Sequence, residues 1–134
     1  MASEGLTSVP SSFQLSETVD RLEAEIKARG MTVFARIDHA AGAASAGLSL
    51  RPTELLIFGN AKAGTPLMQS VQTIGIDLPL KILAWQDASA KVWLTYNDPA
   101  WLAKRHDIGP DATPTISAMA AALGDIARKA TNPP

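Results

Sequence analysis

The stretch that most constrains this chain runs from Thr53 to Met68 and reads TELLIFGNAKAGTPLM. Residues 54–58 form an almost unbroken apolar run, which predicts a strand buried on both faces. Glycines follow at positions 59 and 64, and Thr65-Pro66 has the sequence of a helix N-cap followed by proline at the first helical position. The segment therefore predicts a buried strand, a glycine-containing loop and a short helix in direct succession.

The two glycines have the spacing of a phosphate-binding loop, but the residues after Gly64 exclude one. Thr65 stands where such a loop has its lysine, and Pro66 stands where it has the hydroxyl that binds magnesium. Two interpretations of the loop from Gly59 to Thr65 remain open. In one, Lys62 and the N-terminus of the helix hold a small anion or carboxylate. In the other, Thr65 is an ordinary cap and Lys62 is solvated.

Length and composition limit the class of protein. A chain of 134 residues is enough for one domain with its own core, and a hydrophobic fraction of 46% is typical of a globular protein. The net charge is −1 and no segment concentrates lysine and arginine, so nucleic acid is not an expected partner. With no cysteine, the chain has neither disulfides nor thiolate metal ligands. The sequence shows no signal peptide and no apolar run long enough to span a membrane, so we expect a soluble, cytoplasmic protein without membrane contact.

Hydrophobic periodicity predicts a single α+β domain over residues 6–130, with short tails at 1–5 and 131–134. The expected strands cover residues 6–13, 31–39, 54–58, 78–86 and 91–97. Long helices are expected from about 17 to 29 and after Thr113-Pro114, and short ones over 40–47, after Pro66 and after Asp98-Pro99. Strands do not alternate strictly with long helices, which favours a largely antiparallel or mixed sheet covered by two long helices.

The segments 78–86 and 91–97 are predicted to form a hairpin. A turn centred on Ala88-Ser89 places one set of side chains on a common face: Lys81, Leu83, Trp85, Val92, Leu94 and Tyr96. Both faces of this hairpin are largely apolar, so both need cover. Two long helices can cover one face, and the other then requires short helices or a second subunit. We therefore expect a homodimer, formed through that face or through a sheet edge.

Three segments that occur in order, FGNAKAGTPLM, IDLPLKILAW and KVWLTYNDP, resemble domain-of-unknown-function family 302. The preceding FARIDHAAGAASAGLSLRPTELLIFGN fits the same pattern, and the resemblance extends over about residues 12–130. Ala61 departs from it, because family members usually carry proline after the Gly-Asn pair. The resemblance implies a TATA-box-binding-protein-like fold with the order β-α-β(4)-α and implies no activity. DNA binding does not follow from that fold, since the chain lacks a basic surface.

The candidate ligand-binding residues come from three of the predicted segments, and they are His39, Asn60, Lys62, Thr65 and Tyr96. Asn60, Lys62 and Thr65 belong to the loop described above. Tyr96 is the only tyrosine and is expected on the hairpin face of Leu83 and Trp85, where its hydroxyl needs one hydrogen bond at the edge of the core.

His39 is expected on the strand face that also carries Val33 and Ile37. It is a general base or a ligand donor in one interpretation and a half-buried structural side chain in the other. His39 and His106 lack the spacing of a metal motif, so we expect no metal site. The sequence shows no motif for a nucleophile or a cofactor, and the catalytic residues, if the chain is an enzyme, are unknown.

The sequence thus favours a homo-oligomeric module that binds a small molecule or a peptide, with a small anion as one candidate ligand. One alternative is a purely structural or interaction module without a ligand. The other is an enzyme that uses His39 as general base and Lys62 as electrostatic stabiliser.

Overall fold

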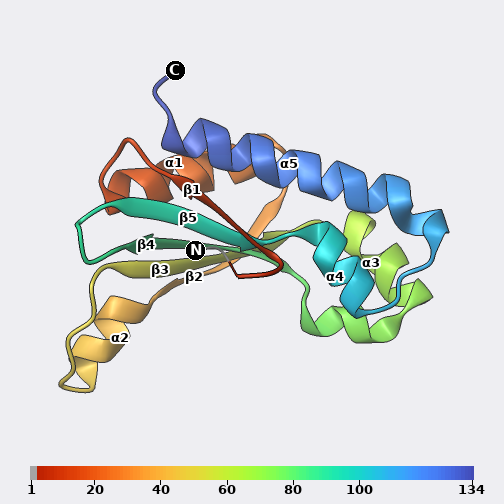
Figure 1. Cartoon of the computed structure of the whole chain (residues 1–134), viewed down its shortest axis with the longest axis horizontal. Helices are drawn as coiled ribbons and strands as arrows, with labels where there is room; N and C mark the ends of the chain where they lie inside the picture. Colours follow the sequence, from red (N-terminus) through yellow and green to blue (C-terminus); the bar gives the residue numbers. More distant parts are fainter. Residues whose placement is uncertain (1–2) are drawn as a thin grey trace.

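Five antiparallel strands form one sheet, in the order β1-β5-β4-β3-β2, in the computed structural model, which describes residues 3–134 (Figure 1). The strands are β1 (Leu6–Pro10), β2 (Thr32–Asp38), β3 (Thr53–Gly59), β4 (Leu80–Gln86) and β5 (Val92–Asn97). The helices are α1 (Leu15–Ala28), α2 (His39–Ser45), α3 (Ala61–Ser70), α4 (Pro99–Arg105) and α5 (Thr113–Thr131), with 3₁₀ turns η1 (Gln72–Ile76) and η2 (Pro110–Ala112). The predicted α+β class and the order β-α-β(4)-α are confirmed.

The long helices α1 and α5 pack against each other on one side of the sheet (Figure 1). In α1 the apolar residues recur every three or four positions, so that Val19, Leu22 and Ile26 all face the sheet and are fully buried. They meet Leu56 and Phe58 of β3 in the main core. We call the helix-covered side of the sheet the inner face and the other side the open face.

The hairpin of β4 and β5 has a register one residue away from the predicted one. Trp85 pairs with Trp93 and Leu83 pairs with Thr95, whereas Val92 and Leu94 were the predicted partners. The cause lies in the turn, because Ala90 has a positive φ of 65° and makes the connection a three-residue loop. A shift of one residue exchanges the two faces of a strand. Val92, Leu94 and Tyr96 consequently lie on the inner face, and Trp93 joins Trp85 on the open face.

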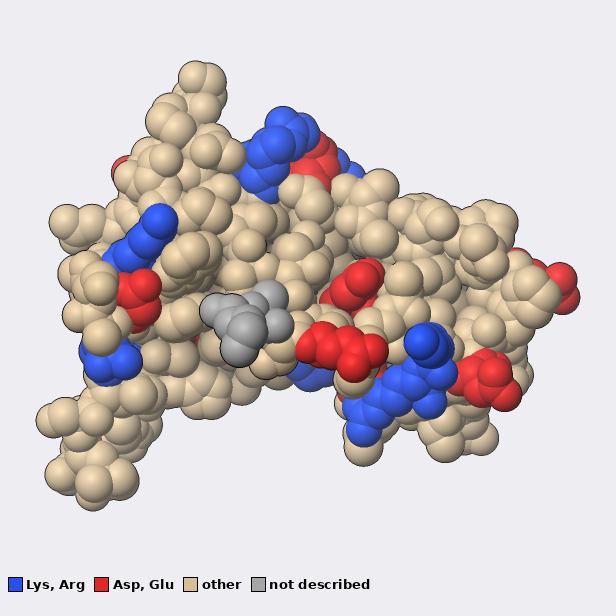
Figure 2. Space-filling model, viewed as in Figure 1, with Lys and Arg blue, Asp and Glu red and all other residues tan. Residues whose placement is uncertain are grey.

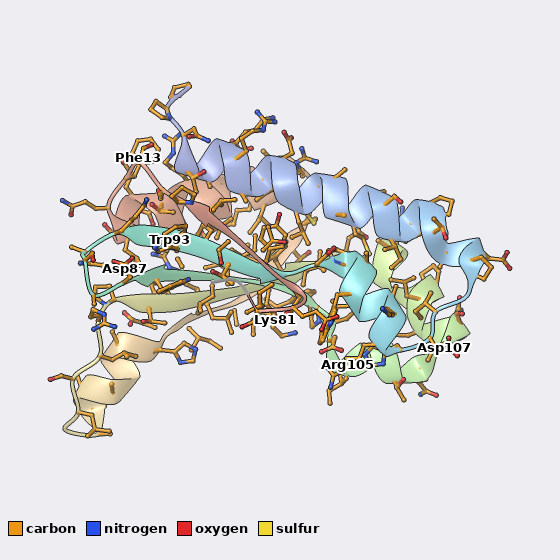
Figure 3. All side chains as sticks on the ribbon, in the orientation of Figure 1. Phe13, Lys81, Asp87, Trp93, Arg105 and Asp107 are labelled. Carbon is orange, nitrogen blue, oxygen red and sulfur yellow. The ribbon has the colours of Figure 1, made fainter. Side chains whose placement is uncertain are left out.

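The carboxylate of Asp87 holds this turn together (Figure 3). Its Oδ1 accepts the backbone N–H groups of Ser89 and Lys91, both at 2.9 Å, and its Oδ2 accepts the indole N–H of Trp93 at 2.9 Å. These hydrogen bonds, that from Trp93 first, lower the pKa of Asp87. The turn is therefore built around an ionised carboxylate.

Acidification is expected to loosen this turn. Because the pKa of Asp87 is lower in the folded chain than in the unfolded one, its stabilising contribution is complete above the unfolded value and is lost as the pH falls through the folded value. Tryptophan fluorescence and thermal unfolding between neutral and acidic pH would show a smaller decrease in Asp87→Asn than in the parent chain. An identical pH profile for both proteins would contradict this role.

Strand β2 contains a β-bulge that changes the faces predicted for its side chains. Val33 pairs with Phe58 but Ala35 pairs with Ile57, so Phe34 is an extra residue between them. Beyond the bulge, Ala35 and Ile37 point to the open face instead of sharing the face of Val33. The strand also ends at Asp38, whose Oδ1 caps α2 by accepting the N–H of Ala41 at 2.9 Å. His39 is therefore the first residue of α2 and is exposed, which corrects its expected place in the strand.

The open face has no long helix over it in the part of the chain that the structure describes. Its apolar side chains are partly exposed, and they include Leu55, Ile57, Leu83, Trp85 and Trp93. Helix α2 and the loop after it, residues 39–50, project from the body of the molecule (Figure 1). This arm contains no Lys, Arg, Asp or Glu, and Figure 2 shows it without any charged side chain. Leu48 and Leu50 in the arm are 68% and 51% exposed.

The N-terminal half of α5 extends beyond the end of the sheet and lies over α3 and α4 (Figure 1). A second, smaller core fills this end of the molecule, where Leu67 of α3, Ile74 of η1 and Ile116 of α5 are buried together. This arrangement leaves a space between α3, α5 and the ends of β2, β3 and β4.

Candidate functional site

Helix α3 begins earlier than Thr65-Pro66 predicts. Its N-cap is Asn60, whose Oδ1 accepts the backbone N–H of Lys62 at 2.8 Å, and its first residue is Ala61. Pro66 lies inside the helix, where its missing N–H leaves the carbonyl of Lys62 without the usual helical partner. The loop expected from Gly59 to Thr65 is thus a strand end, a cap and the first helical turn. Lys62 is placed in that turn.

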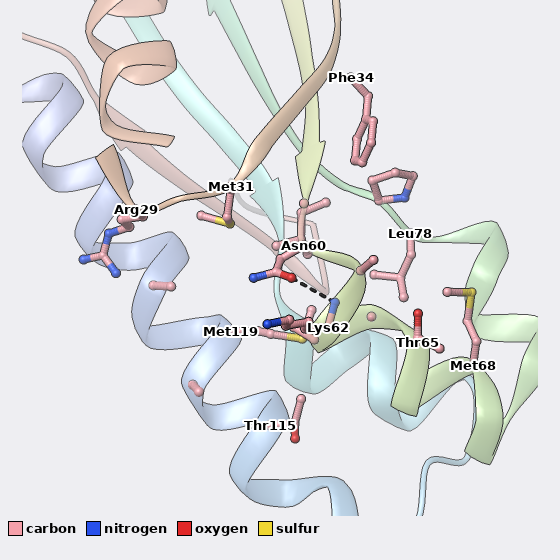
Figure 4. A pocket seen from close by; sticks show the side chains of 18 of the residues that line it. Arg29, Met31, Phe34, Asn60, Lys62, Thr65, Met68, Leu78, Thr115 and Met119 are labelled. Atoms are coloured by element: carbon pink, nitrogen blue, oxygen red, sulfur yellow. Dashed lines mark hydrogen bonds between the residues drawn. The ribbon is translucent and has the colours of Figure 1, made fainter. Parts of the chain in front are cut away.

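A cleft of about 790 Å³ lies between α3, α5 and the sheet end (Figure 4). Its wall is largely apolar and comes from β2, β3, α3, β4 and α5 and from the segments before β2 and β4. The principal side chains are Met31, Phe34, Met68, Leu78, Pro79, Leu80, Pro114 and Met119. Apolar clefts of about 300–1,000 Å³ with few polar groups are the usual form of a small-molecule site.

The polar groups of the cleft carry positive charge and no negative charge. Of the residues that line it, Arg29 and Lys62 are cationic and none is Asp or Glu. Arg29 forms an ion pair with Asp125 of α5, but that carboxylate is shared with Arg128 and Lys129, so it offsets the charge of Arg29 only in part. Lys62 takes part in no ion pair within residues 3–134. Its ammonium group is therefore a source of uncompensated positive charge at the cleft, beside the charge that remains on Arg29.

The structure brings together three of the five candidate residues, since Asn60, Lys62 and Thr65 all line this cleft. His39 does not line it, because it lies on the arm beyond the far end of β2. His39 and Lys62 thus share no cleft, and the arrangement required by the enzyme hypothesis is not formed.

Tyr96 also lies outside the cleft. The one-residue change in register places it on the inner face opposite Ile82, where it is 8% exposed, instead of beside Trp85. Burial raises the pKa of its phenol, and the negative charge of Asp98 adds to the effect. Tyr96 is accordingly a core residue whose hydroxyl lies near Gly124 of α5.

His106, for which the sequence predicts no partner, belongs to a polar cluster that joins η1 to α4. Its Nε2 lies 2.5 Å from Oδ2 of Asp77, and its Nδ1 lies 3.1 Å from the hydroxyl of Thr73. Arg105 donates to both oxygens of the same Asp77 carboxylate at 3.0 Å. Neither Thr73 nor His106 lines the cleft, so we assign the cluster a structural role. Residues 3–134 contain no group of three or more His, Cys, Asp and Glu side chains arranged for a metal ion.

The cleft residues outside the Asn60–Thr65 segment could not be selected from the sequence. Phe34, Leu78 and Met119 are far apart in the chain and read as ordinary apolar positions. The exposure of Phe34 depends on the bulge in β2, and that of Met119 depends on how far α5 extends beyond the sheet. Three of the four methionines of the chain, Met31, Met68 and Met119, line this site, a grouping that only the fold produces.

Comparison with known proteins gives relatives that are longer than this chain. A Brucella suis protein named Fluoride-specific ion channel FluC 1 is 53% identical over 126 residues, which cover 94% of this chain and 50% of that protein. A Brucella abortus protein of the same name is also 53% identical over 94% of this chain, which corresponds to 47% of its length. The chain therefore spans about half the length of the curated relatives it matches. Within residues 3–134 no helix has the length and apolar character needed to cross a bilayer.

A solved structure shows the fold, and a family profile shows the family. The crystal structure of an uncharacterised conserved DUF302 protein from Bacillus stearothermophilus matches with a TM-score of 0.85 and 19% identity, over 96% of this chain and 99% of that one. At that identity the match shows the fold alone. The profile of the family described as Domain of unknown function DUF302 matches residues 7–126. Since this match covers most of the chain, the protein belongs to the DUF302 family.

Proposed function

We propose that this chain is a homo-oligomeric module that binds a small molecule in the cleft between α3, α5 and the end of the sheet. The observation that carries the proposal is the cleft itself, whose volume of about 790 Å³ and largely apolar wall suit a compact organic ligand. Asn60 fixes the start of α3, and Lys62 and Thr65 supply polar groups at the wall. The test below can instead show that the ligand is a peptide or that no ligand binds.

A matched pair of substitutions on α5 tests whether ligands bind in the cleft. Ala118 lines the cleft, whereas Ala121 is exposed on the same helix and does not. A ligand at about a hundred times its Kd stabilises a folded protein by about 2.7 kcal/mol, which raises Tm by several degrees. In a thermal-shift screen of small anions, metabolites and peptides, Ala118→Trp is expected to abolish the shift of true ligands because the indole fills the cleft.

The control, Ala121→Trp, is expected to keep the full shift for the same compounds. Ligands that stabilise both variants equally would bind elsewhere, and the site assignment would then be wrong. If no compound raises Tm in the parent chain, ligand binding fails as the proposed function, and the chain is better explained as a structural module without a ligand.

The homo-oligomeric part of the proposal is supported by the open face. Several of its hydrogen-bonding groups already have partners, because the indole of Trp85 donates to the hydroxyl of Thr95 at 2.8 Å and Ser8 bonds to the same hydroxyl at 2.7 Å. Lys81, the charged side chain beside Ile57 on this face, donates to the carbonyl of Pro79 at 2.9 Å. The face therefore presents mainly apolar surface, which favours contact with another apolar surface. A second copy of the chain would supply one, and closed two-fold symmetry is the commonest arrangement for such contacts.

The curated relatives support a second candidate function, namely a domain that works beside a membrane channel. Half of a protein named as a fluoride-specific channel is 53% identical to this chain. The proposal is that this chain associates with a part equivalent to the remaining half of that protein. The test is to express that remaining half separately and to ask whether it retains the purified chain in nanodiscs. If that half is folded but does not retain this chain, the second candidate function fails, and ligand binding in the cleft stays the proposed function.

A further inference from the structure

We propose that the ligand of the cleft is an amphipathic monoanion, a molecule with one anionic head group and an elongated apolar body. This inference rests on the proposed function, because it names the ligand class for the same cleft. It depends on two features of the wall: the charge at one side of the cleft and the apolar side chains at the other.

The charge comes from Lys62, whose side chain extends toward α5 beside Met119 (Figure 4). No acidic residue lines the cleft, and the nearest carboxylate that pairs with Arg29, Asp125, is shared with Arg128 and Lys129. The lysine therefore attracts an anion, and a cationic head group would meet repulsion without a compensating carboxylate. An ammonium group is a point charge and does not select planar, bidentate anions as arginine does. Carboxylate, sulfonate and phosphodiester heads are all compatible with it.

The amide groups at the start of α3 do not provide a separate anion site. The N–H of Lys62 is bound to the side chain of Asn60, and the N–H groups of Ala63 and Gly64 both approach the carbonyl of Asn60 at 3.0 Å. Three amides of the first turn are thus already occupied. Recognition of the head group depends on the side chain of Lys62.

The opposite side of the cleft is apolar. Figure 4 places Phe34, Leu78 and Met68 on the side of α3 away from the Lys62 ammonium. An apolar body that lies against these side chains gains about 0.8 kcal/mol for each methylene removed from water, which corresponds to about fourfold in affinity. Methionine side chains adapt to ligands of different shape. The wall therefore selects for apolar length more than for exact shape.

Isothermal titration calorimetry with two homologous series tests both features. Hexanoate, octanoate and decanoate, kept below their micelle concentrations, are compared with the alcohols of the same length. Each added methylene is expected to tighten binding by about fourfold or less until the cleft is filled. The carboxylates are expected to bind about tenfold more tightly than the alcohols. This factor is at the lower end of the range for a charge-assisted hydrogen bond, because Lys62 is exposed to solvent. Alkyl sulfonates and alkyl phosphates then determine which head group is preferred.

Variants of Lys62 assign the head group. Lys62→Met keeps the length of the side chain but removes its charge, and it is expected to weaken carboxylates about tenfold and to leave alcohols unchanged. Lys62→Arg is expected to restore most of the difference. Lys104→Met is the matched control, because Lys104 is exposed on α4 and does not line the cleft. Ala118→Trp is expected to abolish binding of both series.

The outcomes separate this inference from the proposed function. One outcome is that carboxylates and alcohols bind equally, that Lys62→Met leaves this binding unchanged, and that Ala118→Trp abolishes it. This result would overturn the anionic head group and would keep the cleft as a binding site. Polar ligands that bind in the cleft while no alkyl compound does would overturn the amphipathic class. Alkyl compounds that bind Ala118→Trp as tightly as the parent chain would show binding outside the cleft, and both proposals would fail.

Discussion

Replacing Phe58 with alanine is expected to lower the free energy of unfolding by about 3–5 kcal/mol. Phe58 is fully buried on the inner face of β3, where it packs with residues of α1. Its removal leaves a cavity that the closely packed helices and sheet fill only in part. A loss of this size is a large fraction of the stability of a typical domain, which is about 5–15 kcal/mol. Urea unfolding followed by tryptophan fluorescence measures it.

The same substitution, phenylalanine to alanine, can be made at Phe34, whose side chain has a different role. It lies at the bulge in β2, is 58% exposed and lines the cleft. Phe34→Ala is expected to cost less than about 1 kcal/mol of stability, since little buried surface is lost. Phe34→Ala is also expected to weaken the binding of an amphipathic ligand, whereas Phe58→Ala would affect that binding only by destabilising the fold. Equal losses of stability in the two variants would contradict the assignment of the core to the inner face.

The fold class could be predicted because it depends on patterns that are local in sequence. The spacing of Val19, Leu22 and Ile26 identifies one helix and the face that it buries. Long helices at the two positions required by the order β-α-β(4)-α, with strands between them, leave few arrangements other than a sheet covered on one side. Helix ends were less certain, since caps compete: Asn60 and Thr65 both have capping side chains, and the structure uses Asn60.

The faces of the strands could not be predicted as well, because each depends on a single backbone angle or a single inserted residue. The positive φ of Ala90 lengthens the hairpin loop by one residue and moves Tyr96 to the core. The bulge at Phe34 reverses the side chains that follow it in β2. Alanine and phenylalanine carry no sequence signal for either conformation. Tyr96 lies away from the cleft for this reason, whereas His39 does so because β2 ends at Asp38, which caps α2.

The cleft combines a predictable part and an unpredictable part. Asn60, Lys62 and Thr65 lie within one short segment, so a single local motif was enough to select them. The opposite wall comes from Phe34, Leu78 and the N-terminal half of α5, which only the tertiary fold brings together. The inference of an anionic ligand from Lys62 required the sequence, whereas the inference of an apolar body required the structure.

Substitution of Leu83 by lysine is expected to convert a dimer into a monomer. Leu83 lies in the middle of β4, the central strand of the sheet, and its side chain is on the open face between Leu55 and Thr95. Five strands about 4.8 Å apart and about six residues long give this face a projected area of roughly 400 Å². A stable dimer needs about 800 Å² from each partner, so the uncharged arm must contribute as well.

A lysine at the centre of such an interface would lose its hydration without gaining a partner, and we expect the dissociation constant to rise by at least about a hundredfold. Ile76→Lys is the matched control, because Ile76 is 74% exposed on η1 and does not belong to the open face. Sedimentation velocity and light scattering at micromolar concentration should give a dimer for the parent chain and Ile76→Lys and a monomer for Leu83→Lys. A monomeric parent chain would remove the oligomeric part of the proposed function. A dimer that tolerates Leu83→Lys would place the contact elsewhere, and the free edge of β2 would then be the next surface to test, because its backbone groups can pair with the same edge of a second copy.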